Sequence, residues 1–444
     1  MPFRRELISA ARGLLQLQND DGGIPAVRNN HASGCWTTAD VLYDILVAGI
    51  LPEIGIRRVR MLVEFLLATQ VSHDGQDEHD DPSGGWPLAM GPRPSVMATG
   101  QSVAALQLAF GLFDSDNELQ QQIRASVAHG FEWLDWAQNQ DGGWGTEPAE
   151  GHEGRRSTIL ATFYALLAYQ QRGDDATHPG AVRQACHYLL SVRNAGDGSW
   201  SARPELPGDP CNTARALSCL VRAKSCAPND ISVVGGLTFI VGQSNPETGV
   251  WEVQQEPFFY RDAGGYINYH QNTICDVLVA FADCGYDGIA AQNALLWLLK
   301  EQTTSGLWPL SSPNWPAREI VTWSTAEWIL ALDATARSCA RSKVLAPPPD
   351  PPTPVRNTFW KVGFSIGAIV STVLAVGGGN PEHAWDNVDH WWSTSTAFRW
   401  IVGTIVVGAV VTAIGNLLSD LMRDRARRAK DIVRKSSKKG KSDD

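Results

Sequence analysis

A chain of 444 residues is longer than one ordinary compact core, which predicts two or three structural units. Hydrophobic residues make up 43% of the chain and charged residues 19%, a balance that excludes bulk disorder. The net charge of −10 excludes a chain-wide nucleic-acid surface, and the eight cysteines contain no Cys-x-x-Cys pair, which excludes a zinc ribbon or thioredoxin-type motif.

One pattern recurs six times between residues 5 and 340. It consists of a helical apolar run, a Gln, a Gly-rich turn and then usually a Trp, and the chain has 17 Trp in all. The clearest copy is Gln138-Asn-Gln-Asp-Gly-Gly-Trp144, whereas the first ends in Ile24 instead of Trp and the fourth begins with Arg193 instead of Gln. We expect the glycine to adopt a positive φ, the Trp to fill the seam between neighbouring units, and the Gln amide to satisfy free groups at helix ends.

Each turn separates two helices of different character. Amphipathic helices, which end at the turns, are predicted at 57–69, 120–137, 181–192, 230–242 and 289–301. Helices rich in Ala, Leu, Ser and Thr are predicted after the turns, at 33–48, 96–113, 157–169, 212–223, 269–282 and 320–335. Hairpins that each bury one face against the next can close into a ring, with the second set of helices inside. The predicted fold is therefore all-α, an (α/α)6 toroid of six helical-hairpin repeats over residues 1–342.

The repeated Gln, Gly and Trp resemble the QW repeat of the prenyltransferase and squalene/oxidosqualene cyclase superfamily. The resemblance covers roughly residues 5–340 and implies a toroid whose apolar lumen takes an isoprenoid. The acid motifs of the cyclases, Asp-x-Asp-Asp and Asp-Cys-Thr-Ala-Glu, are absent from this sequence. The nearest string, Asp77-Glu-His-Asp80-Asp81, is interpreted as a solvated acidic turn, with a weak Ca²⁺ or Mg²⁺ site as the alternative. A cyclase with standard acid chemistry is therefore not expected.

A zinc site is implied by resemblance to the β subunits of protein prenyltransferases. Those subunits hold catalytic Zn²⁺ with Asp-x-Cys at the start of one inner helix and the His of Tyr-His on the next, which here correspond to Asp209, Cys211 and His270. A carboxylate, a thiolate and an imidazole leave a fourth position open for a substrate thiol. In the alternative interpretation, Asp209 is a helix N-cap, Cys211 is a small lumen hydrophobe and His270 is hydrogen-bonded at the mouth.

Aromatic and arginine side chains on the inner helices form the candidate substrate site. The aromatic residues expected to line an apolar cavity are Trp36, Tyr43, Tyr164, Trp323 and Trp328. With the helix N-termini, Arg156 and Arg215 are expected to hold a diphosphate or another anion. In the alternative, the aromatics only pack and the arginines pair with nearby acids. A filled lumen would then make the toroid a scaffold or binding module.

The composition changes after the toroid. A Pro-rich linker is predicted at 343–357, two transmembrane helices within 358–418, and a basic tail at 419–444. The excess of Lys and Arg in the tail places the toroid and the C-terminus in the cytoplasm, so the protein is expected to be a multi-pass protein of the inner membrane with the lipid bilayer as a partner. The small residues of Gly363-x-x-x-Gly367 favour either packing within the hairpin or homo-oligomers.

Two functional classes are consistent with these features. The first is a membrane-anchored toroid that binds an isoprenoid or another apolar ligand, with Zn²⁺-assisted prenyl transfer as its chemistry. The second is a non-enzymatic sensor toroid fused to a two-span effector that perturbs the membrane, as in bacterial antiphage defence. The absent cyclase acid favours the second class, and the pairing of Asp-x-Cys with Tyr-His favours the first.

Overall fold

The protein was analysed as a computed structural model that describes residues 3–28, 31–72, 83–89, 91, 93–148, 153–171, 179–203, 205–245, 248–260, 265–310 and 321–341. The chain divides into two compact units, Met1–Pro347 and Pro348–Asp444. The predicted linker, membrane hairpin and basic tail lie outside the described residues. Among the residues that are described, no helix has the length and apolar character needed to cross a bilayer.

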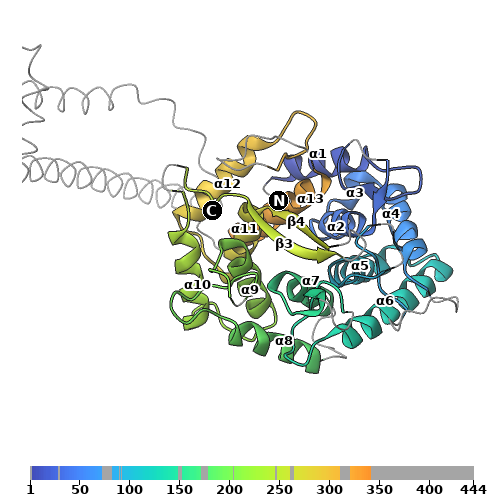
Figure 1. The fold of residues 1–444 in the computed structure, drawn as a ribbon. Coiled ribbons are helices and arrows are strands. Elements are labelled where there is room, and N and C mark those ends of the chain that lie inside the picture. The colour runs from blue at the N-terminus through green and yellow to red at the C-terminus, as the bar shows by residue number, and fades with distance from the viewer. Residues whose placement is uncertain are drawn as a thin grey trace, which may run out of the picture. The chain divides into compact units, whose positions relative to one another are not determined.

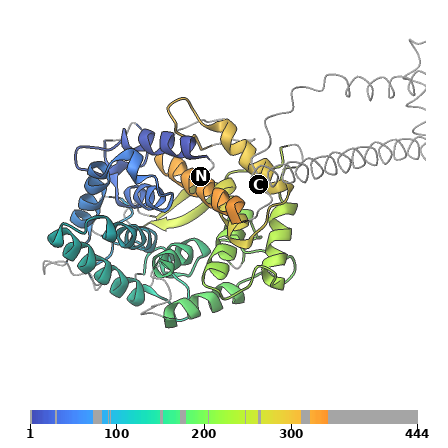
Figure 2. The same cartoon turned by 180° about the vertical axis from the view of Figure 1, so that it is seen from behind.

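The first unit is a closed double ring of helices (Figures 1 and 2). The inner helices are α2 (Cys35–Val47), α5 (Val96–Ala109), α7 (Ile159–Gln170), α9 (Pro210–Arg222), α11 (Thr273–Cys284) and α13 (Thr322–Arg341). The outer helices are α1 (Arg4–Leu15), α4 (Ile56–Thr69), α6 (Asn117–Ala137), α8 (Pro179–Ser191), α10 (Ile231–Gly242) and α12 (Ile289–Glu301). Each inner helix contacts the next, and α13 contacts α2, so the ring closes. The predicted α/α toroid is confirmed.

Shorter elements connect the ring helices. They are β1 (Ile24–Pro25), β2 (Ser33–Gly34), α3 (Leu51–Ile54), η1 (Phe110–Leu112) and η2 (Glu153–Arg155). Side-chain caps begin several inner helices, because Ser95, Thr158 and Asp209 accept hydrogen bonds from the backbone N–H groups of Ala98, Ala161 and Asn212. These caps give the inner helices defined starts at one mouth of the ring.

The repeated Trp fastens each turn to the outer helix before it. Each indole N–H donates a hydrogen bond of 2.6–2.9 Å to a backbone carbonyl. The pairs are Trp86 to Leu66, Trp144 to Leu134, Trp200 to Leu189, Trp251 to Ile240 and Trp308 to Leu298. All five Trp side chains are fully buried. Burying an indole is favourable only when its N–H finds an acceptor, and here a carbonyl of the preceding helix supplies it. Each Trp is thus buried against the outer helix of its own repeat.

The repeated Gln joins neighbouring outer helices. Gln138 Nε2 donates to the carbonyl of Gly142 in its own turn, at 2.8 Å, and to the carbonyl of Ala181 in the first turn of α8, at 3.0 Å. Gln18 and Gln70 make the same pair of bonds in their repeats. Gln302 does so across the closure of the ring, because its second acceptor is the carbonyl of Glu6 in α1, at 3.1 Å. The side-chain amide thus satisfies groups at two successive repeats.

The glycine of the turn has a positive φ in every repeat. The values are 88° at Gly22, 110° at Gly84, 90° at Gly142, 79° at Gly198, 70° at Gly249 and 84° at Gly306. Space is restricted as well as conformation: a Cβ at Gly142 would lie 2.4 Å from the carbonyl oxygen of Gln184 in α8. Only glycine satisfies both restrictions.

Replacing Gly142 by Ala is expected to lower the free energy of unfolding by about 1–3 kcal/mol, because it combines a left-handed backbone with a clash against backbone atoms. Gly180→Ala, in the first turn of α8, is the matched control, since no atom lies within 4 Å of its added Cβ. Thermal unfolding of the two variants checks this expectation. Equal stability of the two would show that the turn relaxes at little cost.

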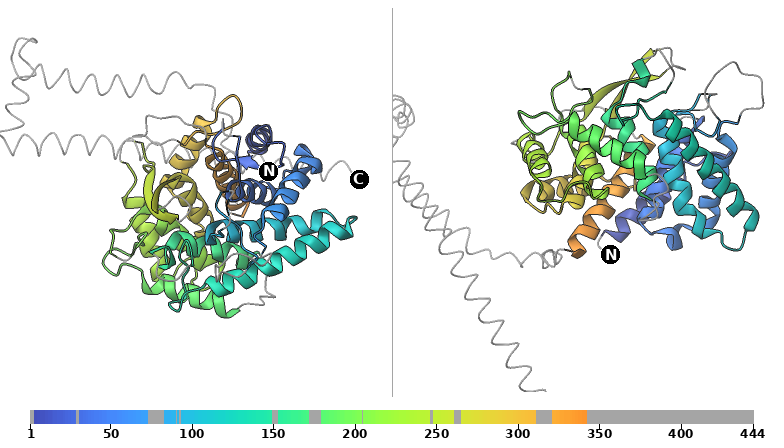
Figure 3. Two further views of the ribbon diagram at one scale, coloured as in Figure 1. Left: turned by 45° about the vertical axis from the view of Figure 1, so that its right-hand side comes forward. Right: turned by 90° about the horizontal axis from the view of Figure 1, so that it is seen from below.

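A β-hairpin interrupts the fifth repeat. Strand β3 (Gln254–Tyr260) pairs antiparallel with β4 (Gly265–Gln271), and Gln255 lies opposite His270. Seen edge-on in Figure 3, the hairpin lies at one end of the ring, and β3 contacts η2 just before α7. The prediction of a helix over 269–282 is therefore wrong at its start: residues 269–271 belong to β4, and α11 begins at Thr273. Runs rich in Tyr, Phe and Ile favour strand over helix here.

Candidate functional site

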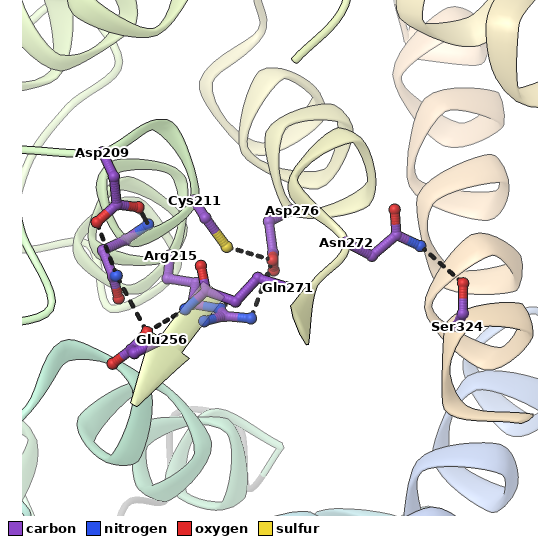
Figure 4. Close-up of polar contacts among 9 residues, drawn as sticks. Asp209, Cys211, Arg215, Glu256, Gln271, Asn272, Asp276 and Ser324 are labelled. Carbon is purple, nitrogen blue, oxygen red and sulfur yellow. Dashed lines mark hydrogen bonds and ion pairs between the residues drawn. The ribbon is translucent and has the colours of Figure 1, made fainter. Parts of the chain in front are cut away.

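Asp209 and Cys211 begin α9 at the mouth that the hairpin faces (Figure 4). The Asp209 carboxylate accepts the backbone N–H of Asn212 at 2.8 Å and the Asn212 amide at 2.9 Å. The Cys211 thiol donates to Asp276 Oδ2 at 2.8 Å, and burial raises the pKa of this thiol well above its ordinary value. In this arrangement the Asp209 carboxylate therefore caps α9, and the Cys211 thiol is paired with Asp276.

His270 does not open an inner helix but lies in β4, with its Nε2 3.1 Å from the Gln255 amide nitrogen. Within the described ranges, no three His, Cys, Asp or Glu side chains are grouped so that they can hold a metal ion. Asp209, Cys211 and His270 thus do not fit a zinc ion in this arrangement. The alternative interpretation, an N-cap, a buried thiol and a hydrogen-bonded imidazole, describes what each residue does.

Arg215 and Asp276 form an ion pair inside the ring. Arg215 Nη2 lies 3.0 Å from Asp276 Oδ2 and Nε lies 3.3 Å from Oδ1, with 1% and 14% of the two side chains exposed. The guanidinium also lies 5.9 Å from the centroid of the Phe163 ring. Arg156, by contrast, forms an exposed pair with Glu205 through two bonds of 2.9 and 2.7 Å. Both arginines expected to hold a diphosphate therefore pair with acids.

The hairpin contributes one buried acid to this network. Glu256 accepts hydrogen bonds from Asn212 Nδ2, at 3.2 Å, and from Gln271 Nε2 (Figure 4). Burial raises the pKa of Glu256 to about 7, against the opposing effect of Arg215. The hairpin is thus joined to α9 through the Glu256 carboxyl group, whose pKa lies near neutral pH.

Three of the five predicted lumen aromatics pack against one another. Trp36 lies 6.1 Å from Trp323 and 6.4 Å from Tyr164, measured between ring centroids. Trp328 is instead stacked on Trp308, the Trp of the sixth turn, at 5.7 Å and 2° between planes, so it packs within the sixth repeat. Where the aromatics meet, the lumen is filled by side chains.

Acidic side chains that the sequence analysis missed lie deeper in the lumen. Asp40, Asp276 and Glu327 line a cavity of about 30 Å³, and Gln101 Nε2 donates to Asp40 Oδ1 at 2.8 Å. Burial is the main cause that raises the pKa values of Asp40 and Asp44 well above their usual range, and neighbouring carboxylates add to it. The sequence signal was present: Asp40 and Asp44 are four residues apart in an otherwise uncharged inner helix, and so share one face.

A larger cavity opens at the other mouth, where the inner helices end. Its volume is about 310 Å³. The lining residues are Tyr43, Val47, Gln170, Gln171, Arg222, Ala282, Asp283, Leu330, Ala334, Arg337 and Ser338. Five inner helices thus contribute to a pocket of mixed polarity, and only Tyr43 among these residues was predicted as a site residue.

The closed double ring of helices defines this unit as an α/α toroid, and solved structures agree. No family model and no curated relative matches the chain. Similar structures include the GH76A α-1,6-mannanase of Salegentibacter, with 9% identity and a TM-score of 0.53 over 76% of this chain and 99% of that chain. Cellobiose 2-epimerase from Bacillus thermoamylovorans has 12% identity and a TM-score of 0.55 over 74% and 98%. A type II terpene cyclase from Scytonema has 18% identity and a TM-score of 0.48 over 76% and 99%. The likenesses to the mannanase and the epimerase, whose TM-scores exceed 0.5, establish the fold alone.

Proposed function

We propose that the toroid is a ligand-binding sensor module, joined by the Pro-rich linker to a two-span hairpin in the inner membrane. The observation that carries the proposal is where the open space lies. The lumen cavity of about 30 Å³ has room for water only, whereas the mouth cavity of about 310 Å³ reaches the size of small-molecule pockets. The lumen cavity is too small for an isoprenoid, and the mouth cavity is lined by charged and polar as well as apolar residues.

The position of the mouth cavity on α13 supports a sensor. Leu330, Ala334, Arg337 and Ser338 of α13 line it, and α13 ends at Arg341, immediately before the predicted linker in the sequence. A ligand in this cavity therefore contacts the helix that leads into the second unit. Differential affinity for two positions of this helix is what would convert binding into a signal.

A second candidate function is isoprenoid chemistry, and the carboxyl group of Asp40 favours it. Burial raises the pKa of Asp40 well above its usual range, which favours the protonated form of this carboxyl group, and Asp40 lines the lumen cavity together with Tyr164. A protonated carboxylic acid is the group that starts the reaction in the cyclases that this sequence resembles. Such a reaction requires the lumen to open around its substrate, and it makes no use of zinc.

Two measurements separate the candidates. Full-length protein and a version that ends at Lys343 are expressed in bacteria, and growth and membrane polarisation are followed. Depolarisation by the full-length protein alone supports the sensor and effector. Purified full-length protein is also incubated with geranylgeranyl diphosphate, beside the Asp40→Asn variant. Turnover that Asp40→Asn abolishes would overturn the sensor proposal and support the cyclase-like one.

A further inference from the structure

We propose that the cavity at the C-terminal ends of the inner helices binds a small ligand through an oxyanion, a phosphate or carboxylate group held between Arg222 and Arg337. The inference rests on the proposed binding function and names the chemical class of the ligand. It concerns the mouth opposite the hairpin, away from Arg156 and Arg215. The residues that carry it are Tyr43, Arg222 and Arg337.

The two arginines come from different inner helices and keep unused donors. Arg222 of α9 donates from Nε to Asp283 Oδ2 at 2.8 Å, and Arg337 of α13 lies with Nη2 2.8 Å from Asp333 Oδ2. A guanidinium carries five N–H groups. Most of these groups, including both Nη groups of Arg222, have no partner among the described residues. Paired N–H groups of this kind bind phosphate and carboxylate oxygens through two parallel bonds.

Tyr43 supplies a third donor from α2. Its hydroxyl oxygen accepts a hydrogen bond from Gln171 Nε2 at 2.9 Å, and no described residue accepts the hydroxyl proton. The side chain is 2% exposed and lines both this cavity and the small lumen cavity, whereas its partner Gln171 lines only the larger one. A ligand in the larger cavity can therefore accept the hydroxyl proton. Burial raises the pKa of Tyr43, and both Arg222 and Arg337 oppose that effect, so the two guanidiniums act on the same hydroxyl group. A ligand oxygen is the acceptor that this site lacks.

The charge balance at this mouth explains why arginines are needed. The C-terminal ends of parallel helices carry partial negative charge, which by itself repels an anion. Arg222 occupies the last turn of α9 and Arg337 lies near the end of α13, where cations offset that charge. Val47, Leu330 and Ala334 are apolar residues in the lining of the same cavity, which also includes Asp283, the partner of Arg222. The site therefore suits a compact ligand with an anionic group and a less polar body.

Binding is tested with pyrophosphate and with tricarballylate, the phosphate and carboxylate probes. Full-length protein in neutral detergent is titrated with each by calorimetry at constant ionic strength. Cellobiose serves as a neutral probe, and short-chain phosphatidylglycerol tests whether a lipid headgroup competes. Arg337→Gln is expected to weaken binding of the preferred oxyanion about tenfold or more. Arg60→Gln is the matched control: Arg60 also forms an (i, i+4) pair, with Glu64 at 2.7 Å, and is 44% exposed against 46% for Arg337.

The binding of each variant supports or overturns the oxyanion site. Loss of oxyanion binding in Arg337→Gln and in Arg222→Lys, which retains the charge beside Asp283, supports the inference if Arg60→Gln binds normally. Tyr43→Phe should weaken binding several-fold without lowering the melting temperature of the unliganded protein. No oxyanion binding at millimolar concentration, or equal loss in Arg60→Gln, overturns the inference. Binding of cellobiose alone would overturn the oxyanion while leaving the sensor function standing.

Discussion

Replacing Arg215 by Met is expected to lower the free energy of unfolding by about 3–5 kcal/mol, because it leaves the largely buried carboxylate of Asp276, 14% exposed, without its counter-ion. The Cys211 thiol, which also donates to that carboxylate, is neutral and provides only a weak hydrogen bond. Chemical denaturation of the variant and the unaltered protein, at one pH and in the same detergent, measures the difference.

Two further variants test whether the loss of stability comes from the unpaired charge. Arg215→Met combined with Asp276→Leu removes both charges and should recover most of the loss, since a buried ion pair contributes little over a packed apolar pair. Arg156→Met breaks an exposed pair with Glu205 and should change stability by less than about 1 kcal/mol. A double variant as unstable as the single one would show that Arg215 acts through packing against Phe163 rather than through its charge.

Replacing Glu256 by Gln is expected to stabilise the protein at pH 8 by up to about 3 kcal/mol and to flatten its pH dependence. Burial raises the pKa of Glu256 from 4.5 to about 7, so the folded state favours the protonated form. Stability from this group is therefore complete below pH 4.5 and is lost as the pH rises through 7. The amide of the variant keeps hydrogen-bonding capacity toward Asn212 and Gln271 without an ionisable proton.

Melting temperatures from pH 5 to pH 8 test the second prediction. Glu205→Gln, at an exposed carboxylate paired with Arg156, serves as the control and should leave the slope unchanged. If the slope of Glu256→Gln matches that of the unaltered protein, Glu256 is ionised in the folded state. The hairpin would then be held over the ring by a charged group instead of a neutral one.

The sequence predicted the fold best at the turns, where each repeat uses the same residue types. The turn between helices requires a glycine with positive φ, an indole that reaches back to a carbonyl and an amide that reaches forward, so Gly142, Trp144 and Gln138 are visible as a motif. The strand β4 was missed because a single insertion in one repeat breaks the period on which the helix prediction relied.

The candidate site was harder to predict because its contacts are not local. Arg215 and Asp276 are 61 residues apart, as are Arg222 and Asp283, so only the closed ring brings them together. Whether a lumen is open or filled also depends on how large side chains from different repeats meet, as Trp36 and Trp323 do. Residue types predicted which helices line the lumen. The ion-pair partners of the arginines and the volume left open between side chains follow only from the three-dimensional arrangement.

The last repeat is joined to the first at several points. Thr322 donates from its backbone N–H to the carbonyl of Ala26 at 3.1 Å, Val321 bridges Val27, and Gln302 reaches Glu6. An open solenoid has two terminal repeats that need polar caps, whereas a ring closed in this way exposes neither. The closing contacts span almost 300 residues (296 from Gln302 to Glu6), so they carry a large loop entropy and are expected to form late in folding. A circularly permuted chain opened at another turn would preserve every seam and move this late step elsewhere in the ring.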